Sequence, residues 1–273
     1  MIVDALARTI TFHQSWLGDN LLCPERSRLN LAFPEKNIGS DATALGTGMH
    51  GYAEVRMLGG DREEAMAAGF AALDHELSLP HNNNGMSDSE CVSFLPTMCA
   101  AWELKILPSV KPGGAVEHKF KVFLGDWNGW KIYLAGTMDY VDPTGKIWDW
   151  KTASQEYKRW EKERWAIQPT AYAIGAINDG LAKSYPINWA YGVVTKSPKK
   201  DPKVQIVEFQ RNEGHARWLW HQITTLLDNA EHAIYTVTDH GWGATTPWTL
   251  NDQHVLCSEK WCGHWSECKG KFV

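Results

Sequence analysis

The chain has 273 residues, of which 44% are hydrophobic and 22% are charged, and its formal net charge is −5. This apolar content can bury a sizeable core, which excludes a disordered or fibrous protein, and we expect one domain over residues 1–273. The acidic balance gives no global attraction for nucleic acid. Because the sequence has neither an apolar run of about 18 residues nor a basic leader, we expect a cytoplasmic protein that does not span a membrane.

The spacing of apolar residues predicts the helices and strands in chain order. A helical start is expected over residues 4–33 with a break near 18–20, followed by helices at 41–58, 62–77 and 91–104. Strands are expected at 115–124, 130–141 and 147–153, then a helix at 169–181, strands at 187–195 and 204–209, and a helix at 212–233. This order predicts an α/β fold with a central mixed sheet flanked by helices.

The strands at 130–141 and 147–153 are joined by the stretch DPTGK, which is typical of a hairpin turn. If Asp142 pairs with Lys146, then Asp139 lies opposite Asp149, and the alternation of side chains places Lys151 on the same face. Directly opposed residues have Cβ atoms about 5 Å apart, and like charges at such positions are destabilising unless a cation neutralises them. The pattern therefore indicates either a Mg²⁺ or Mn²⁺ site beside a lysine or an ordinary solvated hairpin face with charges of both signs.

Two further features have both an ordinary and a functional interpretation. The basic stretch TKSPKKDPK, residues 195–203, is typical of a solvated lysine loop and could also hold a polyanion locally. Most of the fifteen tryptophans are expected in the core or in stabilising clusters, and only a few could stack on bases.

The six cysteines are Cys23, Cys91, Cys99, Cys257, Cys262 and Cys268. The last three are close together in the C-terminal stretch CSEKWCGHWSEC, and clustered thiols in a cytoplasmic chain indicate metal or cluster ligation. His264 could complete a Cys₃His zinc site. Cys23 could instead complete a Cys₄ site for a [4Fe-4S] cluster, and the residues leave both interpretations open. Cys91 and Cys99 belong to an apolar segment and are predicted to be core residues.

Taken in chain order, these features resemble the RecB-type PD-(D/E)XK nucleases. Between the N-terminal cysteine and the three-cysteine tail, the chain carries the motifs GTGMHGYAE, VEHKF, AGTMD, DWK and QPTAY. The resemblance is to the iron-sulphur exonuclease branch, which includes the CRISPR-adaptation exonucleases and the AddB nuclease domain. It implies a restriction-endonuclease-like core whose terminal segments, 1–40 and 250–273, are joined at a cysteine-ligated cluster.

The resemblance also implies roles for individual residues. It implies a Mg²⁺ or Mn²⁺ ion with the ligands His50, Asp139, Asp149 and the backbone carbonyl of Trp150. The implied catalytic residues are Glu117, Asp139, Asp149, Lys151, Gln168 and Tyr172. Glu117 would support the metal site or its water, and Lys151 would stabilise the developing charge on the phosphate or position the attacking hydroxide. The last two would orient the DNA strand near the scissile phosphate. The implied ligands of the [4Fe-4S] cluster are Cys23, Cys257, Cys262 and Cys268.

The sequence departs from the family pattern at two places. The tail reads Cys-x₄-Cys-x₅-Cys, whereas this branch has a two-residue first gap, so zinc stays an alternative to iron-sulphur. Pro169 directly follows Gln168, and proline is favoured in the first turn of a helix. We therefore expect the helix of the QPTAY motif to begin at this point, with Gln168 at its N-terminal boundary.

The resemblance implies an exonuclease that acts on single-stranded or frayed DNA ends in recombination, repair or phage DNA metabolism. A helicase or recombination partner would supply the open strand, and the family allows a homo-oligomer. One alternative is a structure-specific endonuclease on the same fold. The other is a zinc- or cluster-stapled DNA-binding protein without catalytic activity.

Overall fold

The computed structural model describes residues 1–36, 39–82, 85–196, 201–251, 257–259 and 262–269. The chain forms two compact units, one made of residues 1–38, 121–136 and 214–273 and the other of residues 39–120 and 137–213. Strands β5 (Ala115–Trp127) and β6 (Trp130–Val141) contribute to both units, because the boundary falls within each strand. No helix in the described part of the chain is long and apolar enough to cross a membrane.

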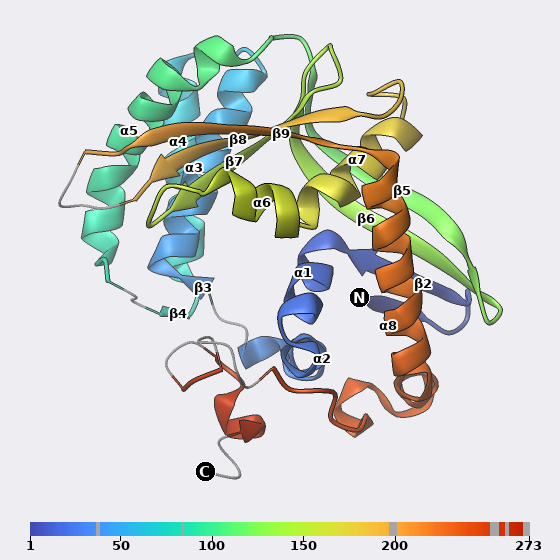
Figure 1. Ribbon diagram of the computed structural model, residues 1–273. Coiled ribbons are helices and arrows are strands. Elements are labelled where there is room, and N and C mark those ends of the chain that lie inside the picture. Colours follow the sequence, from blue (N-terminus) through green and yellow to red (C-terminus); the bar gives the residue numbers. More distant parts are fainter. Residues whose placement is uncertain (37–38, 83–84, 197–200, 252–256, 260–261, 270–273) are drawn as a thin grey trace. The chain divides into compact units, whose positions relative to one another are not determined.

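The second unit is built on a mixed sheet (Figure 1). The C-terminal half of β6 pairs antiparallel with β7 (Ile147–Ala153), and β7 runs parallel to β8 (Ile187–Thr195). Strand β9 (Val204–Arg211) then pairs antiparallel with β8. Because a parallel pair requires a crossover, the chain between β7 and β8 contains two helices, α6 (Arg159–Trp165) and α7 (Gln168–Asn178).

The predicted hairpin register between β6 and β7 is confirmed by the pairing of Tyr140 with Trp148. Asp142 fixes the turn, since its Oδ1 accepts hydrogen bonds from the backbone N–H groups of Thr144 at 2.8 Å and Lys146 at 3.2 Å. This local geometry aligns the two strands that carry the predicted acidic residues.

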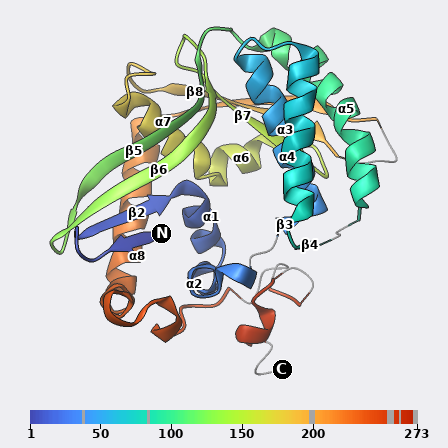
Figure 2. The ribbon, with the colours of Figure 1, turned by 180° about the vertical axis from the view of Figure 1, so that it is seen from behind.

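Three helices cover one face of this sheet and lie side by side (Figure 2). They are α3 (Asp41–Met57), α4 (Arg62–Ser78) and α5 (Asp88–Lys105). Each begins at a side chain that accepts backbone N–H groups of the first turn: Ser40, Asp61 and Ser87. The short elements of this unit are β3 (Gly39–Ser40), β4 (His81–Asn82) and η2 (Leu107–Ser109).

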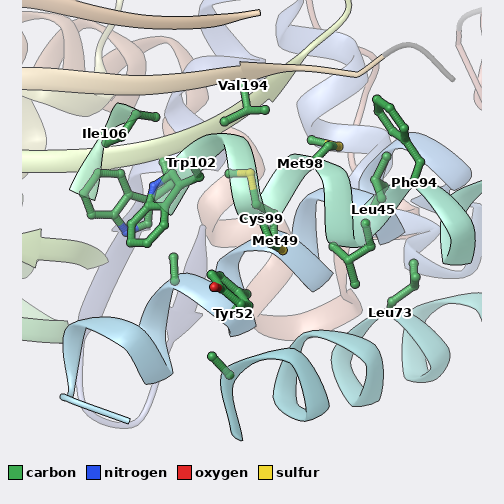
Figure 3. Close-up of a cluster of buried hydrophobic side chains, with 14 of the residues drawn as sticks. Leu45, Met49, Tyr52, Leu73, Phe94, Met98, Cys99, Trp102, Ile106 and Val194 are labelled. Carbon is green, nitrogen blue, oxygen red and sulfur yellow. The ribbon is translucent and has the colours of Figure 1, made fainter. Parts of the chain in front are cut away.

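The core between these helices and the sheet is rich in aromatic side chains (Figure 3). The ring of Trp102 on α5 meets Trp150 of β7 edge-on at a centroid distance of 5.2 Å. Cys91 and Cys99 are fully buried in this core, as predicted. Burial raises the pKa of the Cys99 thiol to about 12, so this residue acts as a small apolar side chain rather than a ligand.

Helix α7 packs on the opposite face of the sheet. Its Tyr172 ring contacts Phe120 and Trp189 at centroid distances of 5.8 and 5.7 Å. Gly175 permits this approach, because a Cβ there would lie 2.6 Å from the Phe120 ring. The helix begins at Gln168, as expected from the following proline. Helices on both faces of a mixed sheet confirm the predicted fold class.

The first unit contains β1 (Ile2–Asp4) antiparallel to β2 (Thr9–His13), and β2 runs parallel to the N-terminal half of β6. Its helices are α1 (Gln14–Leu22), α2 (Pro24–Ala32) and α8 (Glu213–His240), with the short turns η1 (Pro34–Lys36), η3 (Trp242–Ala244) and η4 (Trp265–Glu267). The indole Nε1 of Trp127 donates to Asp228 of α8 at 2.7 Å, and buried Arg28 forms an ion pair with Glu25 at 2.6 Å.

The predicted helical start over residues 4–33 is wrong in its first part. Residues 9–13 form β2, which pairs Ile10 with Ile132 of β6 and buries both Ile10 and Phe12. Three consecutive residues of this strand, 10–12, are buried, and its partner β6 is more than a hundred residues away, so neither the alternation nor the pairing is visible in the local pattern. Helix α6 has no counterpart among the predicted elements, and α8 continues beyond its predicted end to His240.

Candidate active site

A cleft of about 590 Å³ in the second unit lies along one side of α3. Residues three or four positions apart on that helix line it, among them Thr43, Thr47, His50 and Glu54, because a helix presents such residues on one face. Charged side chains from other elements that line the cleft are Glu117, Asp139, Lys151 and Lys196. The cleft therefore has carboxylates and cations on its walls.

Three side chains from three different elements converge in the cleft. They are His50 of α3, Glu117 of β5 and Asp139 of β6. One ring nitrogen of the histidine and one carboxylate oxygen of each acid all lie within 4.8 Å of one another. Carboxylate oxygens suit Mg²⁺, and a carboxylate and imidazole set also suits Mn²⁺. The donor set therefore fits a divalent cation.

The peptide groups of Trp150 hold two of these side chains. The N–H of Trp150 donates to Asp139 Oδ2 at 2.7 Å, and His50 Nε2 donates to the Trp150 carbonyl at the same distance. Because a carbonyl can only accept, Nε2 carries the proton and leaves the lone pair on Nδ1, which lies 3.5 Å from Asp139 Oδ2. Burial lowers the pKa of His50 to about 4, so the imidazole is neutral and able to bind a metal near pH 7.

Glu117 has an unusual backbone and an unusual acidity. Its φ of +46° lies in the left-handed region, which is uncommon for a residue with a side chain and is often found at functional sites. Burial raises the pKa of Glu117 to about 7, and the charges of Asp139, Glu54 and Asp149 add to the shift. A cation bound among these carboxylates would remove the repulsion.

Asp149 and Lys151 form the second part of the site. Asp149 has no exposed surface, and its Oδ2 lies 2.6 Å from Lys151 Nζ. Its Oδ1 accepts from Gln168 Nε2 at 2.7 Å, and that amide also donates to the Tyr172 hydroxyl at 3.0 Å. Burial raises the pKa of Asp149 to about 7. Burial opposes the charge on Lys151, but Asp149 and Asp139 outweigh it and raise the pKa of Lys151.

The family model of the PD-(D/E)XK nuclease superfamily matches residues 23–269. The chain belongs to this superfamily. Among solved structures, a protein described as "Putative exonuclease" from Eubacterium rectale matches with a TM-score of 0.47 and 14% identity, over 81% of this chain and 74% of that chain. No curated protein sequence matches the chain. PD-(D/E)XK nucleases are hydrolases that use divalent metal ions, and the donor set of His50, Glu117 and Asp139 is of that kind.

In this PD-(D/E)XK nuclease the six predicted catalytic residues and His50 all belong to the second unit, and two of the implied metal ligands, His50 and Asp139, converge with Glu117. Glu117 belongs to the converging trio, whereas both oxygens of Asp149 contact other side chains and the Trp150 carbonyl accepts from His50. These contacts tie Asp149 to Lys151, Gln168 and, through that amide, to the Tyr172 hydroxyl.

Sequence reasoning missed Lys196 as a residue of the nuclease cleft. It directly follows β8, and its Nζ donates to the carbonyl of Ala42 at 3.1 Å. The signal for it is the basic stretch 195–203, whose ordinary interpretation is a solvated lysine loop. Residues 197–200 of that stretch lie outside the described residues.

The predicted cluster ligands of the nuclease meet in the first unit. One pocket is lined by the four predicted thiols, those of Cys23, Cys257, Cys262 and Cys268. The rest of its lining is mainly apolar and includes three leucines, Leu22, Leu29 and Leu250, beside the cation of Arg26. Four thiols suit either zinc or an iron-sulphur cluster. Of the segments predicted to form this part, residues 37–38, 252–256, 260–261 and 270–273 lie outside the described residues.

His264, the alternative zinc ligand, has a different environment. Its side chain is buried, and its Nε2 lies 2.7 Å from Asn30 Oδ1. It does not line the thiol pocket, whereas Cys23 does.

Proposed function

We propose that this PD-(D/E)XK nuclease is a metal-dependent exonuclease that hydrolyses single-stranded DNA from its ends. The observation that carries the proposal is the convergence of His50, Glu117 and Asp139 in a cleft that Lys151 also lines. Hydrolysis of a phosphodiester adds the hydroxyl of water to phosphorus and releases the leaving oxygen as an alcohol. The reaction needs a deprotonated water and a neutralised phosphate, and the cleft offers groups suited to both tasks.

The trio would hold Mg²⁺ or Mn²⁺, which when bound lowers the pKa of water and polarises the phosphate. The proposed ligand set includes Asp149 and the Trp150 carbonyl, because the charge of Asp139 contributes to the raised pKa of Asp149 and the Trp150 peptide contacts both His50 and Asp139.

The other proposed catalytic residues act around Asp149. The ammonium of Lys151 would offset the charge that develops on the phosphate oxygens, since it lines the cleft and stays protonated. Gln168 would orient Asp149 through its 2.7 Å hydrogen bond, and Tyr172 would in turn hold the Gln168 amide. In this proposal these two residues position the carboxylate as well as the DNA strand.

The second part of the proposal is a [4Fe-4S] cluster ligated by Cys23, Cys257, Cys262 and Cys268. The shared pocket of the four thiols supports it, and its apolar lining suits a cluster shielded from water. The cluster would join the start of α2 to the C-terminal segment and so act structurally. We further propose that a helicase or recombination partner supplies the single strand, in recombination, repair or phage DNA metabolism.

The proposed activity is tested with end-labelled linear and circular single-stranded DNA of the same sequence, incubated with anaerobically purified protein. We expect linear DNA to be degraded only with Mg²⁺ or Mn²⁺ present, and circular DNA to stay intact because it has no end. Cleavage of the circle would favour the endonuclease alternative. Binding without cleavage under any metal would favour the non-catalytic alternative.

A further inference from the structure

Helix α6 exposes two tryptophans to solvent. Trp160 and Trp165 are 53% and 62% exposed, and their rings meet edge-to-face at a centroid distance of 5.2 Å. The other tryptophans of the second unit are all at most 1% exposed: Trp102, Trp148, Trp150 and Trp189. Two large aromatic rings that stay in water do not contribute the stabilisation that burial would give. This pair therefore differs from the other tryptophans of the unit, which are core residues.

The helix that carries the pair is firmly anchored. Arg211, which is 1% exposed, donates through Nη2 to the carbonyls of Lys162 and Ala166 at 3.2 and 3.1 Å. Its Nε donates to Thr170 Oγ1 at 3.0 Å, which joins the end of α6 to α7. A buried guanidinium with three such bonds holds the C-terminal end of α6 in place, so the exposed rings are presented by an ordered element rather than by a frayed one.

Helix α6 is also close to the catalytic network. It lies between the strand of Lys151 and the helix that begins at Gln168. Burial lowers the pKa of Lys162 on α6, and the charges of Glu161, Lys151 and Asp149 also act on this amine. Packing supports this link: the Lys162 ammonium lies 3.8 Å from the centroid of the Tyr157 ring, and that ring meets Tyr191 edge-on at 5.5 Å. Tyr191 of β8 is the strand partner of Asp149, so α6 is linked through these rings to the strand pair that carries the site.

The charge of this segment complements a nucleic-acid strand. Residues 158–165, KRWEKERW, carry four cations and two carboxylates, although the chain as a whole is acidic. Two of the cations form exposed ion pairs, Lys158 with Glu161 at 3.2 Å and Arg159 with Glu163 at 3.5 Å. Exposed pairs of this kind contribute little to stability, so phosphates can compete for the cations.

We propose that Trp160 and Trp165 form a stacking platform for unpaired bases of the DNA strand that enters the active site. Aromatic side chains beside cations are the usual means of holding single strands without regard to sequence, because every base has a π face. Bases in a duplex are already stacked on both faces, so the platform would select single strands. This inference rests on the proposed function and adds the contact that would distinguish single-stranded from duplex DNA.

The test measures affinity for two short labelled oligonucleotides of equal length and charge, oligothymidylate and its abasic counterpart, in an Asp149→Asn background that does not cleave. We expect the parent to prefer oligothymidylate, and Trp160→Ala or Trp165→Ala to weaken that binding at least about five-fold while leaving the abasic affinity unchanged. Phenylalanine at either position should restore part of the loss. Trp218→Ala, on a 45% exposed tryptophan of α8, serves as the matched control and should change neither affinity.

Several results would overturn the platform. If the parent bound both oligonucleotides with equal affinity, the bases would not contribute to binding and the platform would be ruled out. The proposed nuclease activity would be unaffected by this result. An equal loss on both oligonucleotides would assign the effect to charge or folding, which the melting temperature of each variant checks independently. A change in oligomeric state without a change in affinity would assign the rings to self-association. If the parent bound neither oligonucleotide, the proposed function would fail together with this inference.

Discussion

The Asp149 carboxylate is fully buried, and its nearest cation is the Lys151 ammonium at 2.6 Å. Removing that cation by Lys151→Ala leaves a buried charge without its partner, which typically costs about 3 kcal/mol or more of unfolding free energy. We also expect the rate of DNA hydrolysis to fall by roughly 10²- to 10³-fold, because a donor for the developing phosphate charge is lost. Urea unfolding and single-turnover hydrolysis measure the two effects.

The double variant Lys151→Ala, Asp149→Asn separates the two roles. An amide needs no counter-charge, so the double variant should recover much of the lost stability and stay inactive. If it were as unstable as Lys151→Ala alone, the instability would come from packing around the lysine side chain, and the buried ion pair would not explain it.

The raised pKa values of Glu117 and Asp149, each about 7, predict how pH acts on the metal-free protein. Their ordinary values are near 4 in the unfolded chain, so the folded state binds more protons between about pH 4 and pH 7. Stability should therefore fall as the pH rises through this window, and it should stay low above it. A divalent cation offsets the repulsion, so Mn²⁺ should raise the melting temperature more at about pH 8 than at about pH 5.

Glu117→Gln is the control for this pH dependence. It should flatten the fall in stability and reduce the gain from Mn²⁺ at high pH. An unchanged slope in this variant would show that other groups control the pH dependence.

Among the individual residues, the sequence predicted the acidic pair and its lysine because a short turn fixes their register. Glu117 was implied only as a support of the metal site, by the resemblance, and its place among the converging donors depends on how β5 meets α3. Lys196 was missed for the same reason, since only the fold brings the end of β8 to the first turn of α3.

Among the elements, α3 positions His50 through its close packing on α4. A Cβ at Gly48 would lie 3.0 Å from the Gly69 carbonyl and 3.1 Å from Leu73 Cβ. Gly48→Ala should therefore force the two helices apart and destabilise the protein by about 1–3 kcal/mol, and it should weaken Mn²⁺ binding as His50 shifts. Denaturant titration and Mn²⁺ binding measure both results.

Gly18→Ala is the matched control, because that glycine also lies in a helix and no atom lies within 4 Å of the added Cβ. It should stabilise the protein by up to about 1 kcal/mol through helix propensity and leave Mn²⁺ binding unchanged. If Gly48→Ala behaved in the same way, the close contact of α3 with α4 would have no role in placing His50.

The elements that the sequence predicted well are those whose signals are local. The β6–β7 hairpin is specified by its turn, and α7 by a proline in its first turn. Strand β2 and helix α6 depend on distant partners, β6 in one case and the buried Arg211 in the other. Their form is therefore set by tertiary contacts that periodicity does not contain.

For the whole molecule, the proposed cluster would close most of the chain into one loop, from Cys23 to the C-terminal cysteines. Such a link restricts the unfolded chain, so its loss should destabilise the protein. Cys23→Ala should remove the visible absorbance of a [4Fe-4S] cluster and lower the melting temperature together. Cys91→Ala, a core cysteine outside the pocket, should keep the chromophore.

Metal analysis of the purified protein distinguishes an iron-sulphur cluster from a zinc site. Iron and sulphide at a constant ratio to protein would support iron-sulphur, and zinc without colour would support the alternative. A Cys23→Ala variant with full metal content and unchanged melting would remove residue 23 from the ligand set.

Titration of the electron paramagnetic resonance signal of Mn²⁺ measures whether His50, Glu117 and Asp139 bind the proposed catalytic cation. We predict binding to the wild-type protein that is lost or strongly weakened in Glu117→Gln and in Asp139→Asn, and retained in Lys196→Ala, which removes a cation that lines the same cleft. Wild-type affinity for Mn²⁺ in both carboxylate variants would contradict the account.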